Sequence, residues 1–210
     1  AGPTQERIDP IRYVSHNSSG KQGYALAEEF LKLGASVTLI SGPTNINKPN
    51  VNKFIEVLSA EEMLSQVENN IDCDIFISSA AVCDWKLIPY TLTNKKLSKD
   101  DKLKKNKDIF FKLETNPDII KFVSKNKKRP TLVIGFAAET KNLIQNATKK
   151  LEEKQLDMII ANLIEKENAI FGEEYNKIFM IDKQCKIQES EKLTKNKIAN
   201  LIISKTLKLH

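Results

Sequence analysis

The sequence predicts an α/β fold with a Rossmann-like, mainly parallel sheet, helices on both faces, a lysine-rich lid loop and a C-terminal strand excursion. Three observations predict it. Short apolar, β-branched runs alternate along the chain with amphipathic stretches of helical period. Clusters of small and polar residues follow predicted strands or precede predicted helices, where open α/β sheets bind ligands. No internal repeat or low-complexity tract competes with this pattern.

Length and composition favour a single soluble domain. With 210 residues and 40% hydrophobic content, the chain is long enough for one sizeable core, so we interpret residues 1–210 as one domain. No apolar run approaches the roughly 20 residues of a membrane helix, and the sequence contains no signal peptide. The three cysteines, Cys73, Cys83 and Cys185, fit a reducing compartment better than a disulfide framework. We therefore expect a cytoplasmic protein with no membrane contact.

The charge of the chain suits an anionic ligand. Its formal net charge is +6 and its pI is about 9.1. Few aromatic residues are interleaved with the lysines, so a solvated basic surface is favoured over a nucleic-acid interface. No histidine or cysteine spacing is typical of a metal site.

A polar stretch at residues 15–23, Ser-His-Asn-Ser-Ser-Gly-Lys-Gln-Gly, directly precedes an amphipathic run. Ser18 or Ser19 can cap the helix that follows, and Gly20 lets a ligand approach the backbone. The free N–H groups and the dipole of the helix then face a phosphate. The alternative is an ordinary capped helix without a ligand. The stretch is not a P-loop, because Ser15 and Gln22 stand where that pattern needs Gly and Ser or Thr.

Predicted helices and strands alternate through the first half of the chain. An apolar stripe at helical spacing, closed by Gly34, predicts a helix after the polar stretch. A capping box at Ser59 and Glu62 opens a second helix. Buried strands are predicted at residues 35–40, 54–58 and 74–78. The last of these ends in small residues, which indicates that something packs closely there.

Residues 86–112 break this periodicity. Lysines crowd a polar segment at positions Lys95, Lys96, Lys99, Lys102, Lys104, Lys105 and Lys107. Such a run is usually a flexible solvated loop, but inside a compact domain it can be a lid that closes over an anionic substrate. We therefore expect a lysine-rich lid at about residues 86–112.

The second half continues the α/β alternation. Asn116 is predicted to cap a helix in which Pro117 takes the first position. Further strands are expected at residues 132–136 and 158–162, helices at 143–151 and 194–207, and an edge hairpin at 177–181 and 186–187. The polar clusters at residues 15–23, 78–84 and 135–140, with Asn162, would then converge on one crevice at the carboxyl ends of the strands.

The chain starts in Ala-Gly-Pro-Thr, which is typical of a loop with no strand before it. We therefore expect the sequence to be truncated at its N-terminus, with upstream residues that include a β-strand.

Six segments in order resemble bacterial phosphopantothenoylcysteine synthetase, the ligase half of the bifunctional coenzyme A biosynthesis flavoprotein. They are residues 1–10, 18–21, 80–85, 102–105, 116–119 and 135–140. In that family a flavin-dependent decarboxylase domain precedes the ligase. The resemblance therefore implies a single nucleotide-binding ligase domain and a fused or associated decarboxylase.

The reaction that the resemblance implies has two steps. The carboxylate of 4'-phosphopantothenate attacks the α-phosphate of CTP, giving an acyl-cytidylate and pyrophosphate, and the amine of cysteine then displaces CMP. Such a site holds a triphosphate with Mg²⁺ and stabilises an oxyanion. The family is dimeric, and residues 163–190 are expected to form part of the interface of a homodimer.

The resemblance also implies the residues of the site. Ser18, Ser19 and Gly20 match the triphosphate loop, and Ser78, Ser79 and Ala80 match the loop that contacts the nucleotide, with the carboxylate of Asp84 beside it. The residues that match a nucleotide-binding turn, a ring near the cytosine and two helical lysines are Pro117, Asp118, Ile119, Ile120, Phe136, Lys150 and Lys154. Phe136 alone would more often be a core residue, and the two lysines a solvated helix face.

Two departures from the family pattern leave alternatives open. The family has Asn-x-Ser-Ser-Gly, whereas here His16 holds that position and the asparagine is Asn17. An amide donor suits an oxyanion at any pH, which favours Asn17 for the acyl-cytidylate step, while His16 is a donor when protonated. In the lid, alignment from Asn116 selects Lys102 as the catalytic lysine, with Lys95 as its rival.

Three other functions remain as alternatives to the CTP-dependent ligase. The nearest is an ATP-using version of the same ligase. A dinucleotide-dependent oxidoreductase is disfavoured because no G-x-G-x-x-G follows a strand in this sequence. A nucleic-acid-binding module without catalysis is disfavoured because the lysines gather in one segment.

Overall fold

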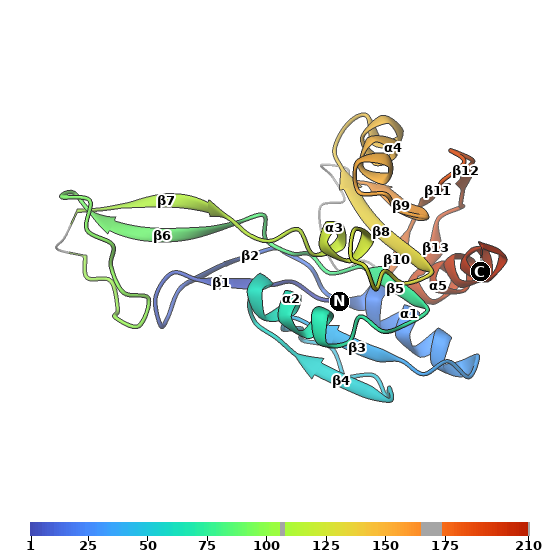
Figure 1. Ribbon diagram of the computed structural model, residues 1–210, viewed down its shortest axis with the longest axis horizontal. Coiled ribbons are helices and arrows are strands. Elements are labelled where there is room, and N and C mark those ends of the chain that lie inside the picture. Colours follow the sequence, from blue (N-terminus) through green and yellow to red (C-terminus); the bar gives the residue numbers. More distant parts are fainter. Residues whose placement is uncertain (106–107, 165–173, 210) are drawn as a thin grey trace.

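The computed structural model describes residues 1–105, 108–164 and 174–209. The chain forms a body built on a five-stranded sheet and a long arm that projects from it (Figure 1). Helices cover the sheet, and the arm consists of two antiparallel hairpins, β1–β2 and β6–β7. The predicted α/β class is therefore confirmed.

The central sheet is mixed rather than mainly parallel. Its strand order is β12-β11-β9-β8-β5. The strands are β5 (Ile75–Ser78), β8 (Leu132–Glu139), β9 (Met158–Leu163), β11 (Phe179–Asp182) and β12 (Ile187–Glu189). The first three run parallel, whereas β11 and β12 pair antiparallel and form the predicted C-terminal excursion. A short turn after β11 reverses the chain direction, so β12 must pair antiparallel with β11.

Helices lie on both faces of the sheet, as predicted. The helices are α1 (Lys21–Lys32), α2 (Ala60–Asn69), α3 (Ile119–Ser124), α4 (Leu143–Glu153) and α5 (Lys195–Leu209). Val133 packs in the core cluster that includes α2, α3 and α4, whereas its neighbour Ile134 packs with α1 and α5. Successive side chains of a strand point to opposite faces, so β8 serves both cores. Both residues are fully buried.

Residues 1–4 lie between the end of β3 and the end of β5, and their backbone groups are hydrogen-bonded to both. Strands β3 (Thr38–Ser41) and β4 (Lys53–Glu56) pair in parallel. The carbonyl oxygen of Ala1 accepts from the N–H of Gly42 at 3.0 Å, just after β3. Beyond the end of β5, Ala81 donates to Gly2 O at 2.9 Å and accepts from Thr4 N at 3.1 Å. The opening segment is therefore an ordered connector and not a free loop.

The expectation of an aperiodic lid at residues 86–112 is wrong at both ends of that range, which are strands. Strands β6 (Trp85–Thr91) and β7 (Ile109–Thr115) form a seven-residue antiparallel ladder, with Trp85 opposite Thr115 and Thr91 opposite Ile109. Lys86, Lys112 and Glu114 lie on one face of the ribbon, and the other face carries no charged residue, which is the alternation of a half-buried strand. The crowding of lysines between the two strands masked this alternation in the sequence. Only the lysine-rich connection between the two strands lacks regular structure over its described part.

The second hairpin of the arm was not predicted. Strands β1 (Gln5–Arg7) and β2 (Tyr13–Ser15) pair antiparallel beside β6. At the other end of the molecule, β10 (Tyr175–Asn176) and β13 (Leu193–Thr194) form a further short antiparallel pair. Strands of two or three residues carry too little pattern to be recognised in a sequence.

Two helix starts differ from the prediction. Gly20, not Ser18 or Ser19, is the N-cap of α1, although Ser19 Oγ accepts from the N–H of Lys21, the first residue of that helix, at 3.4 Å. Asp118, not Asn116, is the N-cap of α3, because its carboxylate accepts from Lys121 N at 3.1 Å. The capping residue at Ser59 is confirmed, since its hydroxyl accepts from Glu62 N at 3.1 Å.

In the described part of the chain, no helix is long and apolar enough to cross a membrane. Of the expected dimer interface at residues 163–190, positions 165–173 lie outside the described residues. The rest of that interface stays a prediction.

Candidate functional site

The N-terminus of α1 is a tightly closed backbone turn. Gly20 is buried with φ 74°, and a Cβ atom there would lie 2.7 Å from Thr44 Cγ2. Neither the dihedral angle nor the space accepts a side chain. Gly20 itself offers no side-chain cap, and the N–H of Lys21 donates to Ser19 Oγ at 3.4 Å, so the N–H groups that a helix start leaves without an intrahelical partner are those of Gln22 and Gly23. The geometry of this helix start is set by Gly20, with one long bond to Ser19, and the anion site stays a prediction.

The loop after β5 abuts this helix start. A Cβ atom on Gly23, in the first turn of α1, would lie 2.6 Å from Ser79 Oγ. Ser78 ends β5, and Ser79 and Ala80 continue toward the connector of residues 1–4. The structure therefore brings the predicted triphosphate loop and the predicted nucleotide loop together.

His16 and Asn17 lie at the edge of the same region, and both are exposed. The Nδ1 atom of His16 is 3.2 Å from the carbonyl oxygen of Ala81, so its ring faces the loop after β5. Ser18 N donates to His16 O at 2.9 Å, which turns the chain sharply before Gly20. The choice between His16 and Asn17 stays open.

Asn116 ties two predicted site segments together. Its backbone N–H donates to Asp84 O at 2.8 Å, and its side-chain amide donates to Cys83 O at 2.9 Å. Its Oδ1 atom is buried and has no partner among the described residues. These bonds place exposed Asp84 beside Pro117, at the base of the arm. The sequence interpretation quoted Asn116 but missed this function, because it treated the residue as a helix cap.

The two predicted lysines of α4 are each paired with a carboxylate. Lys154 Nζ lies 3.0 Å from the Asp118 carboxylate, which joins two predicted site residues. Lys150 Nζ lies 2.6 Å from Glu139, whose other oxygen accepts from Asn146 at 2.9 Å. Burial alone would raise the pKa of Glu139, but the hydrogen bonds from Lys150 and Asn146 outweigh it and lower the pKa. Glu139 was not predicted as a site residue, although it belongs to one of the six motifs.

The apolar site candidates Phe136, Ile119 and Ile120 all pack against the core. Ser78 is opposite Gly135 in the sheet, so half-buried Phe136 lies one residue beyond the end of β5. Its side chain packs against the α1 and α5 core. Ile119 is buried, and Ile120 packs on β8 at the position of Gly135. The side chains of Ile119 and Ile120 therefore serve the core, and a ligand at this turn would meet backbone groups.

The structure does not bring Lys102 to the start of α1. Its neighbour Leu103 is held at the turn of the β1–β2 hairpin, out along the arm (Figure 1). Lys102 and Lys95 are both exposed. In this structure the lysine segment, residues 95–105, therefore stands apart from the rest of the predicted site.

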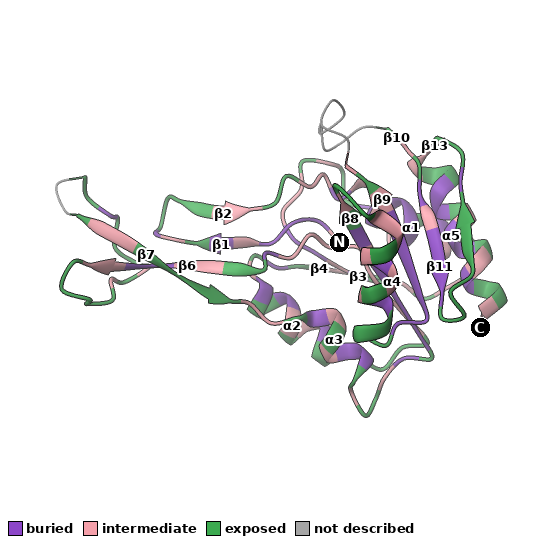
Figure 2. Ribbon diagram, turned by 90° about the horizontal axis from the view of Figure 1, so that it is seen from above, coloured by how far each residue is buried: buried purple, intermediate pink, exposed green. Residues whose placement is uncertain are grey.

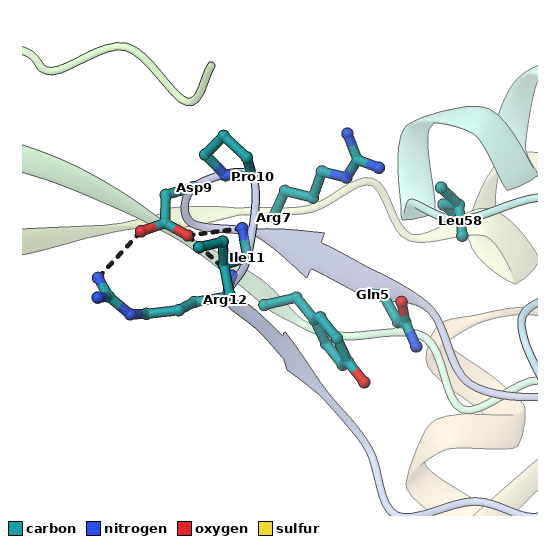
Figure 3. Close-up of a pocket in the computed structure, with 8 residues that line it drawn as sticks. Gln5, Arg7, Asp9, Pro10, Ile11, Arg12 and Leu58 are labelled. Atoms are coloured by element: carbon teal, nitrogen blue, oxygen red, sulfur yellow. Dashed lines mark hydrogen bonds and ion pairs between the residues drawn. The ribbon is translucent and has the colours of Figure 1, made fainter. Parts of the chain in front are cut away.

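A hollow of about 200 Å³ lies between the β1–β2 hairpin and Leu58 (Figure 3). It is lined by Gln5, Arg7, Asp9, Pro10, Ile11, Arg12, Tyr13 and Leu58. The sequence interpretation had not considered this surface, because the hairpin itself was not predicted.

Comparison with known proteins assigns the family. Residues 1–209 match the family described as DNA/pantothenate metabolism flavoprotein C-terminal domain. The chain belongs to this family. The resemblance drawn from the six ordered motifs is thereby confirmed.

Three similar proteins illustrate the relationship. The coenzyme A biosynthesis bifunctional protein CoaBC of Borreliella burgdorferi is 44% identical over 207 residues, which are 97% of this chain and 50% of that protein. A cysteine/cysteine sulfinic acid decarboxylase from an unknown prokaryotic organism is 41% identical over 211 residues, 100% of this chain and 57% of that protein. The crystal structure of a CoaBC C-terminal domain superposes with a TM-score of 0.78 at 37% identity, covering 98% of this chain and 90% of that one. The chain thus spans about half the length of the curated relatives it matches.

The carboxylate of Asp84 is the kind of donor that binds Mg²⁺ together with the phosphates of a substrate. Among the described residues, no group of three or more His, Cys, Asp or Glu side chains could hold a metal ion. Mg²⁺ commonly keeps several waters and is bound by one or two carboxylates together with substrate phosphates. Exposed Asp84 beside the nucleotide loop fits such a partial set.

The closed turn at Gly20 can be tested against a second glycine. Gly34 has a similar φ of 85°, but nothing lies within 4 Å of its Cβ position. Both Gly20→Ala and Gly34→Ala should lose about 1–2 kcal/mol of unfolding free energy from the left-handed backbone. Only Gly20→Ala should also weaken nucleotide binding, because its methyl group would push apart Thr44 and the helix start. Urea unfolding and titration with CTP measure the two effects, and equal nucleotide affinity in both variants would contradict the assignment.

Proposed function

We propose that this chain carries out the CTP-dependent ligation of 4'-phosphopantothenate to cysteine. The family match over residues 1–209 supports this proposal most strongly. The observation in the structure that supports it is the meeting of the Gly20 turn, the Ser79 loop and the segment of His16 and Asn17 at one end of α1. This region has the anion-binding character that a triphosphate needs.

The chemistry explains why such a site uses a nucleotide. A carboxylate is a poor acyl donor because it is anionic and has no good leaving group. Attack of its oxygen on the α-phosphate breaks the bond to the β-phosphate, so pyrophosphate leaves and a mixed anhydride remains. The amine of cysteine then attacks the acyl carbon, CMP leaves with the bonding electrons, and the nitrogen loses a proton.

Residues of the chain hold the reactants for these steps. The N–H groups in the first turn of α1 bind the triphosphate, and Lys102, which the arm holds apart from that turn of its own chain, neutralises the charge that develops at the α-phosphate of the partner subunit in the homodimer proposed below. Asn17 or His16 donates to the oxyanion formed when the amine attacks. Mg²⁺, held by the triphosphate and Asp84, would withdraw charge from the phosphate oxygens.

The choice of nucleotide is directly testable. Pyrophosphate release with phosphopantothenate and cysteine should be much faster with CTP than with ATP. Equal rates would contradict the CTP assignment and support the ATP-dependent alternative. Cysteine alone provides a further control, because one relative is named as a cysteine decarboxylase. Release of CO₂ without a nucleotide would favour that activity instead.

Lys102 and its rival Lys95 form a matched pair. Both are exposed lysines of the same segment and neither forms an ion pair in the described part of the chain. Lys102→Gln should lower pyrophosphate release by at least about a hundredfold, because a charge clamp on the reacting phosphate is lost, while the melting temperature stays unchanged. Lys95→Gln should retain turnover. The reverse result would move the catalytic function to Lys95.

The second half-reaction separates Asn17 from His16. Asn17→Asp replaces an amide donor by a carboxylate that repels the oxyanion. The acyl-cytidylate should therefore accumulate in that variant, as detected by chromatography of quenched reactions. An unchanged rate of final product would assign the function to His16, and His16→Ala should then accumulate the intermediate.

We also propose a homodimer that uses the arm. Trp85, Leu87, Phe111 and Leu113 share one face of the β6–β7 ribbon, and that face carries no charged residue. Trp85 is 53% exposed and Leu113 is 64% exposed. A two-stranded ribbon needs a second layer to be stable, and an uncharged face can meet its own copy without repulsion.

The dimer is tested by one glutamate placed on either face of β7. Leu113→Glu should give monomers in light scattering, because it buries a charge between two apolar faces. Lys112→Glu puts the same side chain on the opposite face and should leave the dimer intact. A dimeric Leu113→Glu variant would contradict this interface and favour residues 163–190.

A further inference from the structure

One buried carboxylate connects the β1–β2 turn to the lysine segment. Asp9 is fully buried, and its Oδ1 atom accepts from the N–H groups of Ile11 and Arg12, each at 2.8 Å. Its Oδ2 atom accepts from Arg12 Nη1 at 2.9 Å and from Leu103 N at 3.2 Å. Figure 3 shows the carboxylate between the turn and the Arg12 guanidinium. One oxygen therefore organises the turn, and the other holds a residue far away in the sequence.

Arg12 completes the contact from the other side. Its Nη2 atom donates to Leu103 O at 3.4 Å. The single ion pair Asp9–Arg12 thus satisfies both the N–H and the C=O of Leu103. The Asp9 carboxylate and the Arg12 guanidinium are charged, so their bonds to the Leu103 backbone are stronger than bonds between neutral groups.

We call this contact of Asp9 and Arg12 with Leu103 the clasp. It determines which side chains of residues 101–105 face solvent. Leu103 is 8% exposed, whereas Asp101, Lys102, Lys104 and Lys105 are all exposed. A sequence this polar has no apolar surface of its own to order it, and each ordered residue costs conformational entropy. Anchoring Leu103 at its backbone and side chain therefore fixes Lys102 and Lys104 on either side of it.

The carboxylate stays charged at neutral pH. Burial alone would raise the pKa of Asp9, but hydrogen bonds from the N–H groups of Ile11, Arg12 and Leu103, with the charge of Arg12, outweigh it and lower the pKa. The clasp contributes stability above the ordinary pKa of an aspartate and loses it only as the pH falls through the lowered value.

We propose that Asp9 and Arg12 are positioning residues that clasp Leu103 and so place Lys102 for the phosphate chemistry. This inference rests on the proposed function for the use of the lysine, but the clasp itself does not. No substrate contact is assigned to Asp9, because its carboxylate is enclosed by its own partners.

Asp9→Asn separates the two halves of the contact. The asparagine Oδ1 can still accept from Ile11 and Arg12, so the hairpin turn is kept. Its Nδ2 group replaces Oδ2 and would face two donors, the Leu103 N–H and the Arg12 guanidinium. The lysine segment should therefore open while the fold remains. Arg12→Gln, which removes both guanidinium bonds and leaves the Asp9–Leu103 bond, is the second variant.

The readout that does not depend on activity is limited trypsin cleavage after Lys102, Lys104 and Lys105, located by mass spectrometry. Cleavage in Asp9→Asn should be at least about tenfold faster than in the wild type at equal melting temperature, and Arg12→Gln should lie between them. Asp101→Asn, which removes the same charge beside Lys102 without touching Leu103, should be cleaved like the wild type. Unchanged cleavage in Asp9→Asn would overturn the clasp.

The catalytic consequence is measured on the same proteins. The kcat for pyrophosphate release should fall at least about tenfold in Asp9→Asn, with the KM for CTP changed less than about twofold, because a displaced lysine loses transition-state contact rather than nucleotide binding. Faster cleavage with unchanged kcat would overturn the positioning function. A wild-type protein that releases no pyrophosphate would instead contradict the proposed function, and the cleavage result would still decide the clasp.

Discussion

The close approach of three backbone segments is the constraint on which the site depends. A Cβ atom on Gly42 would lie 1.7 Å from Pro3 O, and one on Gly20 would lie 3.4 Å from Gly2 Cα. The end of β3, the connector of residues 1–4 and the start of α1 therefore touch without side chains between them. Because Ala81 also bonds to the connector, the loop after β5 is fixed to the same point. A site built on backbone N–H groups needs such rigidity, since these groups cannot rearrange independently.

The arm extends this constraint to a second region. Strands β6 and β7 leave the body at Asp84 and Asn116, whose backbone groups are bonded to each other. The β1–β2 hairpin continues from the same connector and packs beside β6. The lysine segment is held at the tip of that hairpin by Asp9. A displacement of residues 1–4 would therefore shift both the Gly20 turn and the lysine segment, although these two regions lie apart in Figure 1.

The sequence predicted the elements whose pattern is local. Helix α1 shows an apolar stripe over 12 residues, and Gly34 ends it in the left-handed conformation that the pattern indicated. Strands β8 and β9 were predictable as buried apolar runs. The β6–β7 ribbon was missed because Pro89 interrupts the pattern of β6 and no short turn signals a hairpin between the two strands. The clasp of Leu103 by Asp9 joins residues 94 positions apart, and no single-sequence pattern contains that contact.

The site residues were predicted from motifs, but their electrostatic state was not. Lys150 and Lys154 each lie against a carboxylate, so their charges are largely compensated before any ligand binds. Lys102, Lys104 and Lys105 form no ion pair in the described part of the chain, and the Gly20 turn supplies only partial charges. In the proposed ligation, a triphosphate at α1 would draw on the lysine segment for uncompensated positive charge. The ion pair at the tip of the arm, between buried Asp9 and exposed Arg12, then acts through where it holds those lysines.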